Sequence, residues 1–173
     1  MRKIWLHLFV IVLLLSTTIG TAQISFKTIQ KDFHKLSGAW EGSLTYVDYS
    51  TGKPYTMPAD LIIKRVGMTN KIVFSNIYPK ETSANSIDTI SILSDGKYID
   101  QALVKSRRKL PNGEIEIITE EFGKDVNDNN AATLRHTYTL GKTIFKKRKD
   151  VQFIGKAEWI NRNEYSYKKK SNQ

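Results

Sequence analysis

The sequence of 173 residues contains no cysteine. It can therefore form no disulfide, and it offers no cysteine for lipidation after a signal segment. A domain without disulfides must be stabilised by burial of its hydrophobic core. Residues 23–173 are enough for that, because a domain of about 150 residues buries roughly 68–70% of the surface of its unfolded chain. We expect one domain.

Signatures of common enzymes and metal sites are also missing. The sequence has no His-Glu-x-x-His, no Gly-x-Ser-x-Gly and no glycine-rich phosphate loop. No catalytic residue, metal site or cofactor is predicted from motifs, and an enzyme ranks last among the functions considered. Several acidic residues could still meet in a cleft as an acid and a base, which spacing alone does not reveal: Glu81, Asp88, Glu120 and Glu121.

Only one long apolar run occurs, Ile4–Leu15, and it lies near the N-terminus behind Arg2 and Lys3. Small residues follow it, ending at Ala22. This pattern predicts a secretory signal peptide, residues 1–22, cleaved after Ala22. The alternative is an anchor that stays in the membrane, but the run is shorter than the roughly 20 residues of a bilayer span, and His7 interrupts it. We expect a periplasmic or secreted protein.

Positive charge exceeds negative charge. Without the signal segment the chain keeps 25 lysines and arginines against 17 acidic residues, a net charge of +8. Two basic runs, Lys105–Lys109 and Lys146–Lys149, form one patch if their strands are neighbours. Solubility is the favoured interpretation of this positive charge. Contact of the patch with an anionic lipid or glycan surface is the alternative. Nucleic acid is not expected as a partner of an exported protein, and we expect a monomer.

Hydrophobic periodicity changes once along the chain. Ile29, Phe33 and Leu36 recur at helical spacing and predict a short helical turn that closes one end of the fold. From Trp40 onward the period is two, which predicts strands. The predicted strands are Trp40–Tyr49, Tyr55–Val66, Lys71–Ile77, Ser86–Leu93, Lys97–Lys105, Glu114–Glu121, Ala131–Leu140, Thr143–Lys149 and Glu164–Lys168.

Short turns join these strands. Asp95-Gly96 and Asn112-Gly113 are typical of tight hairpins, in which both central residues take a positive φ. Consecutive strands are therefore antiparallel. Eight or nine strands leave two unpaired edges unless the sheet closes on itself. We expect an all-β fold, a single antiparallel up-and-down barrel; a sandwich is the alternative.

The segment Leu36–Leu44 resembles the Gly-x-Trp opening of the calycin superfamily, which includes lipocalins, fatty-acid-binding proteins and small secreted lipocalin-like bacterial proteins. In that group a short helical turn precedes the motif and the tryptophan closes the barrel floor. A basic residue of the last strand packs across the indole, a cation–π contact. The resemblance therefore implies that Gly38 and Trp40 close the barrel and that Arg162 lies over the ring.

If Trp40 points inward, strand alternation predicts which side chains share the interior. The candidates for a ligand-binding set are Tyr46, Asp48, Tyr55, Met57, His136 and Tyr138. Apolar walls with a few polar groups are typical of small-molecule sites, so the leading prediction is a barrel that binds an apolar or amphipathic small molecule. The alternative is an envelope interaction or inhibitor module with a packed interior and a basic outer surface.

Two further patterns indicate bound ions or cofactors only weakly. Gly38-x-Trp40-x-Gly42 also resembles the start of nitrobindin-type haem barrels, in which His136 would ligate the iron; a core histidine bonded to Tyr138 is the other interpretation. Residues 125–130 imitate the first half of a calcium loop. The second half fails, because Asn130 and His136 stand where glycine and glutamate are needed. We therefore interpret this segment as a polar hairpin loop.

Overall fold

The computed structural model describes residues 26–48, 50–93 and 96–171. The predicted signal segment, residues 1–22, lies outside these ranges. Within them, no helix has both the length and the apolar character that crossing a membrane requires.

One short helix precedes the strands. It is α1 (Phe26–His34), and a single 3-10 turn, Thr82–Ala84, interrupts a later loop. The strands are β1 (Gly38–Asp48), β2 (Lys53–Pro58), β3 (Asp60–Arg65), β4 (Lys71–Ile77), β5 (Ser86–Ser91), β6 (Tyr98–Ile99), β7 (Ala102–Lys109), β8 (Ile115–Lys124), β9 (Ala131–Leu140), β10 (Ile144–Phe153) and β11 (Ile160–Lys169).

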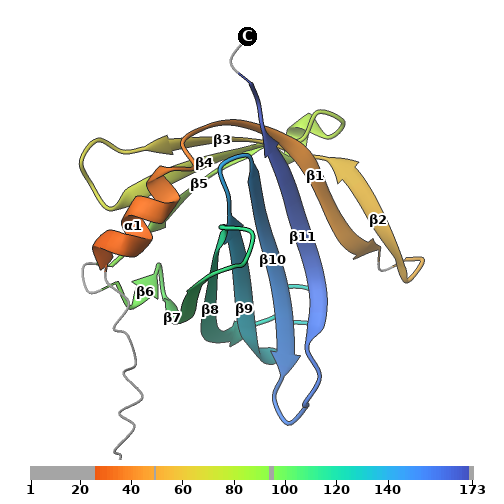
Figure 1. The fold of residues 1–173 in the computed structure, drawn as a ribbon. Coiled ribbons are helices and arrows are strands. Elements are labelled where there is room, and N and C mark those ends of the chain that lie inside the picture. The colour runs from red at the N-terminus through yellow and green to blue at the C-terminus, as the bar shows by residue number, and fades with distance from the viewer. Residues whose placement is uncertain (1–25, 49, 94–95, 172–173) are drawn as a thin grey trace, which may run out of the picture.

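The strands form one antiparallel sheet that curls into a nearly closed barrel of ten strands (Figure 1). The order around the barrel is β5-β4-β3-β1-β11-β10-β9-β8-β7-β6, and β2 pairs with the second half of the curved β1. Within the described residues, the two ends of this order meet at an isolated bridge between Ile92 and Ile99. The all-β barrel is thus confirmed, and the sheet is continuous rather than split into the two layers of a sandwich.

The described residues contain more strands than the predicted eight or nine, because two of the predicted strands are each divided in two. The predicted strand Lys97–Lys105 is a hairpin, in which Ile99 pairs with Ala102 around Asp100 and Gln101. Asp100 takes a φ of 53°, a conformation that aspartate tolerates better than most residues. The predicted strand Tyr55–Val66 is interrupted only at Ala59, where β2 gives way to β3 along the same edge of β1.

Of the two predicted hairpin turns, one is fully described by the structure and the other only in part. At Asn112-Gly113 only Gly113 has a positive φ, 86°. The Gly113 N–H donates to the Leu110 carbonyl, and the Leu110 N–H donates to the Glu114 carbonyl. Pro111 therefore occupies the second position of a four-residue turn that favours proline, and glycine completes a three-residue hairpin loop. In the other turn Asp95 lies outside the described residues, and Gly96 has a φ of 70°.

α1 closes one end of the barrel, as predicted. The side chains of Ile29, Phe33 and Leu36 are fully buried in the main core. Phe33 packs edge-on against the ring of Tyr138, with 5.3 Å between centroids. The Arg107 Nε donates to the buried carboxylate of Asp32 at 2.7 Å, which ties α1 to β7.

The Gly-x-Trp segment lies at this same end. Trp40 is 1% exposed, and its indole Nε1 donates to the Leu36 carbonyl at 2.7 Å. Gly38 has a φ of 130°, a backbone conformation that residues with a Cβ rarely adopt. Glycine at 38 thus lets the chain turn from α1 into β1 and directs the indole into the core.

Gly42 allows β1 to lie directly against β11. A Cβ at this position would stand 2.2 Å from the Ser166 carbonyl oxygen and 2.7 Å from the Tyr167 ring. The register pairs Gly42 with Tyr167, whose ring is buried over the glycine. The absence of a side chain at 42 therefore fixes how closely these two strands approach.

Candidate functional site

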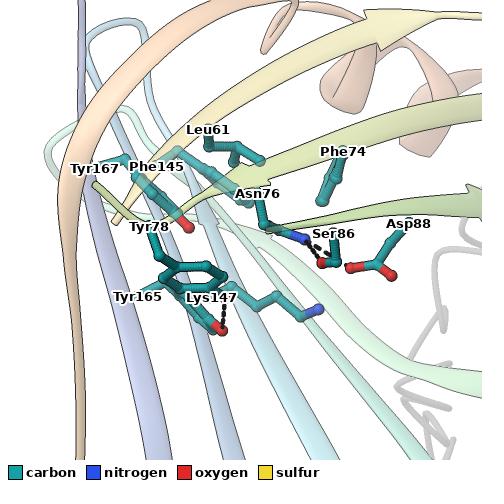
Figure 2. A pocket seen from close by; sticks show the side chains of 10 residues that line it. All are labelled: Leu61, Phe74, Asn76, Tyr78, Ser86, Asp88, Phe145, Lys147, Tyr165 and Tyr167. Carbon is teal, nitrogen blue, oxygen red and sulfur yellow. Dashed lines mark hydrogen bonds between the residues drawn. The ribbon is translucent and has the colours of Figure 1, made fainter. Parts of the chain in front are cut away.

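A cavity of about 170 Å³ lies inside the barrel between β3–β5 and β10–β11 (Figure 2). One side of it is apolar and is formed by Leu61, Phe74 and Phe145. Phe74 and Phe145 meet edge to face with 6.1 Å between ring centroids, and Phe145 stacks on Tyr167 at 5.7 Å. These contacts fix the rings, so this wall offers a rigid apolar surface.

Tyrosines form a second part of the lining. The hydroxyls of Tyr78 and Tyr165 are 2.9 Å apart and share a hydrogen bond (Figure 2). Tyr165 also stacks on Tyr167, with 5.9 Å between centroids. Burial raises the pKa of the Tyr165 and Tyr167 phenols far above their usual value. Both phenols are therefore neutral at physiological pH, and each can donate a hydrogen bond.

The mouth of the cavity is polar. The Asn76 amide donates to the Asp88 carboxylate at 2.7 Å and to the Ser86 hydroxyl at 3.0 Å. Ser86 and Asp88 belong to β5 and are exposed to solvent, whereas Asn76 on β4 is half-buried. The cavity therefore opens beside β5, the strand at one end of the sheet order.

Lys147 extends into the cavity from β10 (Figure 2). It is paired in register with Tyr138 on β9 and with Tyr165 on β11. In the part of the chain that the structure describes, no ion pair joins its ammonium to a carboxylate. Burial lowers the pKa of Lys147, and the positive charge of Lys149 lowers it further, while Asp88 and Asp100 oppose the shift. The site thus combines an aliphatic amine, phenols and an apolar wall.

None of the six sequence-predicted ligand residues lines this cavity. Met57 belongs to a second core cluster with Ala59 and Tyr78, against which Tyr46 also packs. Tyr46 and Tyr55 are cross-strand partners with 5.6 Å between ring centroids. Met57 is therefore packed in this second core cluster, whereas Tyr55 is 46% exposed.

Asp48 has a local role in the turn after β1. Its carboxylate accepts hydrogen bonds from the Ser50 backbone N–H at 2.8 Å and from the Ser50 hydroxyl at 2.7 Å. The hydroxyl hydrogen bond, followed by the backbone one, lowers the pKa of Asp48. The side chain therefore stabilises the turn and does not reach the interior.

His136 and Tyr138 face the interior from β9 but lie outside the cavity lining. Tyr138 is buried in the main core, and burial raises the pKa of its phenol strongly. Burial, together with the nearby Lys147 and Lys149, lowers the pKa of His136 to about 4, so its imidazole is neutral. A neutral imidazole suits iron, but a haem macrocycle is far larger than the 170 Å³ available and His136 does not face that space. The surroundings of His136 do not fit haem.

The cation over Trp40 is Lys169 and not Arg162. The Lys169 Nζ lies 5.3 Å from the indole centroid, and Lys169 is the register partner of Trp40. Arg162 lies toward the other end of β11, where its guanidinium packs over Phe153 at 5.6 Å. The residue implied by the resemblance is thus wrong, although a basic residue of the last strand does occupy the position over the ring.

Arg162 instead binds the loop of residues 125–130, whose sequence imitates half of a calcium loop. It donates to the carboxylate of Asp125 at 2.6 Å and also to that of Asp128. Asp125 is 0% exposed, and the Lys149 ammonium is 3.9 Å from its other oxygen. The acidic side chains of this loop are therefore neutralised by the protein's own cations. Among the described residues, no cluster of three or more His, Asp or Glu could hold a metal ion.

The two basic runs do not merge into one patch. β7 and β10 are separated by β8 and β9. Within Lys146–Lys149 the side chains alternate, so Lys146 is 47% exposed on the outside whereas Lys147 enters the barrel. A separate basic groove of about 600 Å³ lies at the α1 end, bordered by four lysines, Lys35, Lys109, Lys142 and Lys169.

Sequence reasoning missed the residues that line the cavity, although one signal for them was present. A strand that reads Phe145-Lys146-Lys147 must point one of two adjacent lysines to the side that buries Phe145. The same alternation places Tyr165 and Tyr167 on one face of β11. Reading the lysines as an outer basic run obscured the inward position of Lys147.

Comparisons with known proteins give no family for this chain. No family model matches it, and no curated protein matches it. Solved structures of similar fold include Rv2717c from M. tuberculosis, with 11% sequence identity and a TM-score of 0.49 over 82% of this chain and 96% of that one. A protein of unknown function from the DUF3598 family of Nostoc punctiforme has 12% identity and a TM-score of 0.39, over 79% of this chain and 48% of that one.

Proposed function

We propose that this protein binds a small amphipathic molecule inside its barrel, in the cavity that Lys147 enters. The observation that supports this function is the division of the lining. Leu61, Phe74 and Phe145 offer apolar surface on one side, and phenol, amide and ammonium groups face the same space. The polar groups would orient a ligand, while burial of its apolar part against this one side would drive binding.

The volume of the cavity restricts the size of the ligand. An apolar cavity of about 150 Å³ holds one benzene molecule, and the cavity here measures about 170 Å³. A single ring or a short acyl chain with one polar end fits this space. A long-chain fatty acid does not fit, because its chain would extend far beyond the wall formed by Phe74 and Phe145.

We expect benzyl alcohol to bind with a Kd of about 1 mM or tighter, and hexadecanoate not to bind in the cavity. Isothermal titration calorimetry on the folded protein measures both. The S86F variant places a ring at the mouth and should weaken binding of benzyl alcohol about ten-fold or more. I87F is the matched control, because Ile87 is the next residue of β5 and is 74% exposed. Equal affinities in S86F and I87F would place the ligand elsewhere.

We also propose that the protein acts outside the cytoplasm. The predicted signal segment supports this, and the mature chain should begin at Gln23. Protein recovered from the periplasm or medium of an expressing Gram-negative bacterium should have the intact mass of residues 23–173. The A22F variant should keep the segment, since signal peptidase requires small residues before the cut. An exported protein with the full-length mass would contradict the proposal.

The basic groove at the α1 end supports a second candidate function, contact with an anionic lipid or glycan surface. Lys109 and Lys142 are exposed there and make no ion pair within the described part of the chain. Binding through this groove would weaken as salt is added, because exposed charges are screened within about 10 Å at 0.1 M salt. Binding of a neutral molecule in the cavity would not weaken as salt is added.

A further inference from the structure

We infer that Lys147 captures small aldehydes inside the barrel by forming a reversible imine through its Nζ. This inference rests on the proposed binding of a small molecule in the same cavity, and it adds the chemical class of the ligand. A carbonyl compound with one ring would pack against the apolar wall and present its carbonyl carbon to the amine.

The position of Lys147 is unusual for a lysine. Its register partners Tyr138 and Tyr165 both face inward, so the side chain lies within the barrel and not along its outer wall. Transfer of an ammonium group from water into a protein interior is costly unless a carboxylate pairs with it. In the cavity the Asn76 amide donates a hydrogen bond to the Asp88 carboxylate, and among the described residues Asp88 forms no ion pair with Lys147. Burial in these surroundings therefore lowers the pKa of Lys147.

Some of the charged groups around Lys147 raise its pKa and others lower it. Asp88 on β5 and Asp100 after β6 attract the ammonium, whereas Lys149 on the same strand repels it. His136 on β9 is neutral. Burial outweighs the attraction of the two carboxylates and lowers the pKa of Lys147. Each unit by which a pKa falls raises the neutral fraction at pH 7 about ten-fold, and only the neutral amine is a nucleophile.

The neighbouring phenols supply the proton transfers that imine formation needs. The Nζ lone pair forms the new C–N bond, and the carbonyl oxygen takes up a proton to give a carbinolamine. Nitrogen then loses a proton and the hydroxyl group leaves as water, so amine and aldehyde yield imine and water with no change of oxidation state. The Tyr165 hydroxyl, hydrogen-bonded to that of Tyr78 at 2.9 Å, lies in the same cavity as a neutral donor. Hydrolysis by the reverse steps releases the aldehyde.

Reductive trapping tests the inference on the folded mature protein. Benzaldehyde is added at pH 7 with sodium cyanoborohydride, which reduces the imine to a stable benzylamine, and peptide mapping by mass spectrometry locates the label. We expect one benzyl group, on Lys147, at a level about ten-fold or more above that of Lys146. The label should disappear in K147R and persist in K146R, because Lys146 is the adjacent residue on the outer face.

Competition between benzyl alcohol and benzaldehyde tests the inference without any variant. Benzyl alcohol cannot form an imine, so it should suppress labelling of Lys147 in the unmodified sequence. If benzyl alcohol binds while the label spreads over surface lysines according to their exposure, the inference is overturned and the proposed binding function stands. If benzyl alcohol does not bind at all, the proposed function fails and the inference fails with it.

Discussion

Replacement of Arg162 by methionine is expected to lower the free energy of unfolding by about 3–5 kcal/mol. Methionine retains much of the packing over Phe153 but removes the guanidinium, which is 9% exposed and donates to the fully buried Asp125. The carboxylate would keep the Lys149 ammonium, 3.9 Å from one oxygen, but would lose the arginine. Loss of one partner from a buried pair is costly because the remaining charge stays out of water. Urea unfolding followed by circular dichroism measures the change.

R108M is the matched control for this variant. Arg108 also pairs with a carboxylate at 2.7 Å, that of Glu116, but the arginine side chain is largely exposed. Exposed pairs contribute only about 0–1 kcal/mol. Adding D125N to R162M should recover part of the lost stability, because the buried negative charge at position 125 is then removed. An R162M variant that unfolds at the same urea concentration as R108M would show that Asp125 does not depend on Arg162.

Replacement of Gly42 by alanine is expected to destabilise the barrel by about 3 kcal/mol or more. The new Cβ would stand 2.2 Å from the Ser166 carbonyl oxygen, which is backbone and cannot rotate away. β1 and β11 would have to separate where Gly42 pairs with Tyr167. For a chain of this length, that loss corresponds to a fall of roughly 6–12 °C in Tm, which differential scanning calorimetry measures.

G123A provides the comparison within the same sheet. Gly123 lies in β8 without a positive φ, and a Cβ there would meet the Leu134 Cδ1 at 3.3 Å. That atom is the end of a flexible side chain and can move aside, so the change in stability should be under about 1 kcal/mol. Similar losses in G42A and G123A would mean that close approach of β1 to β11 does not require glycine.

Much of the fold was predictable because its signals are local. Period two from Trp40 onward gave the strands, and the spacing of Ile29, Phe33 and Leu36 gave the helix that closes one end. The missed hairpin at Asp100 carries no glycine or asparagine, so its turn depends on an aspartate that adopts a positive φ only once flanking strands pair. Alternation also does not specify that the two sheet ends meet at a bridge between Ile92 and Ile99, although these residues are close in sequence.

The candidate site was harder to predict than the fold. Alternation assigns a side chain to the interior, but packing decides which part of the interior stays empty. Tyr46 and Met57 were expected around a cavity, yet they fill the space beside Tyr78. Lys147 was expected on the outside as part of a charged run. Arg162 was expected over Trp40, but Lys169 lies there. The pairing of β11 with β1 decides which residue of β11 lies opposite Trp40, and the residue type alone does not reveal this pairing.

The bridge between Ile92 and Ile99 bears on how small molecules could enter the barrel. Among the described residues, β5 is paired along its length only with β4. Local fluctuations that break few hydrogen bonds occur far more often than complete unfolding. We therefore expect β5 to separate from β6 at this seam more often than the barrel unfolds, and the cavity mouth at Ser86 and Asp88 to widen when it does. For the ligand proposed above, we therefore expect the rate of release and the lifetime of the native state to be separate properties, which substitutions along this seam would change independently.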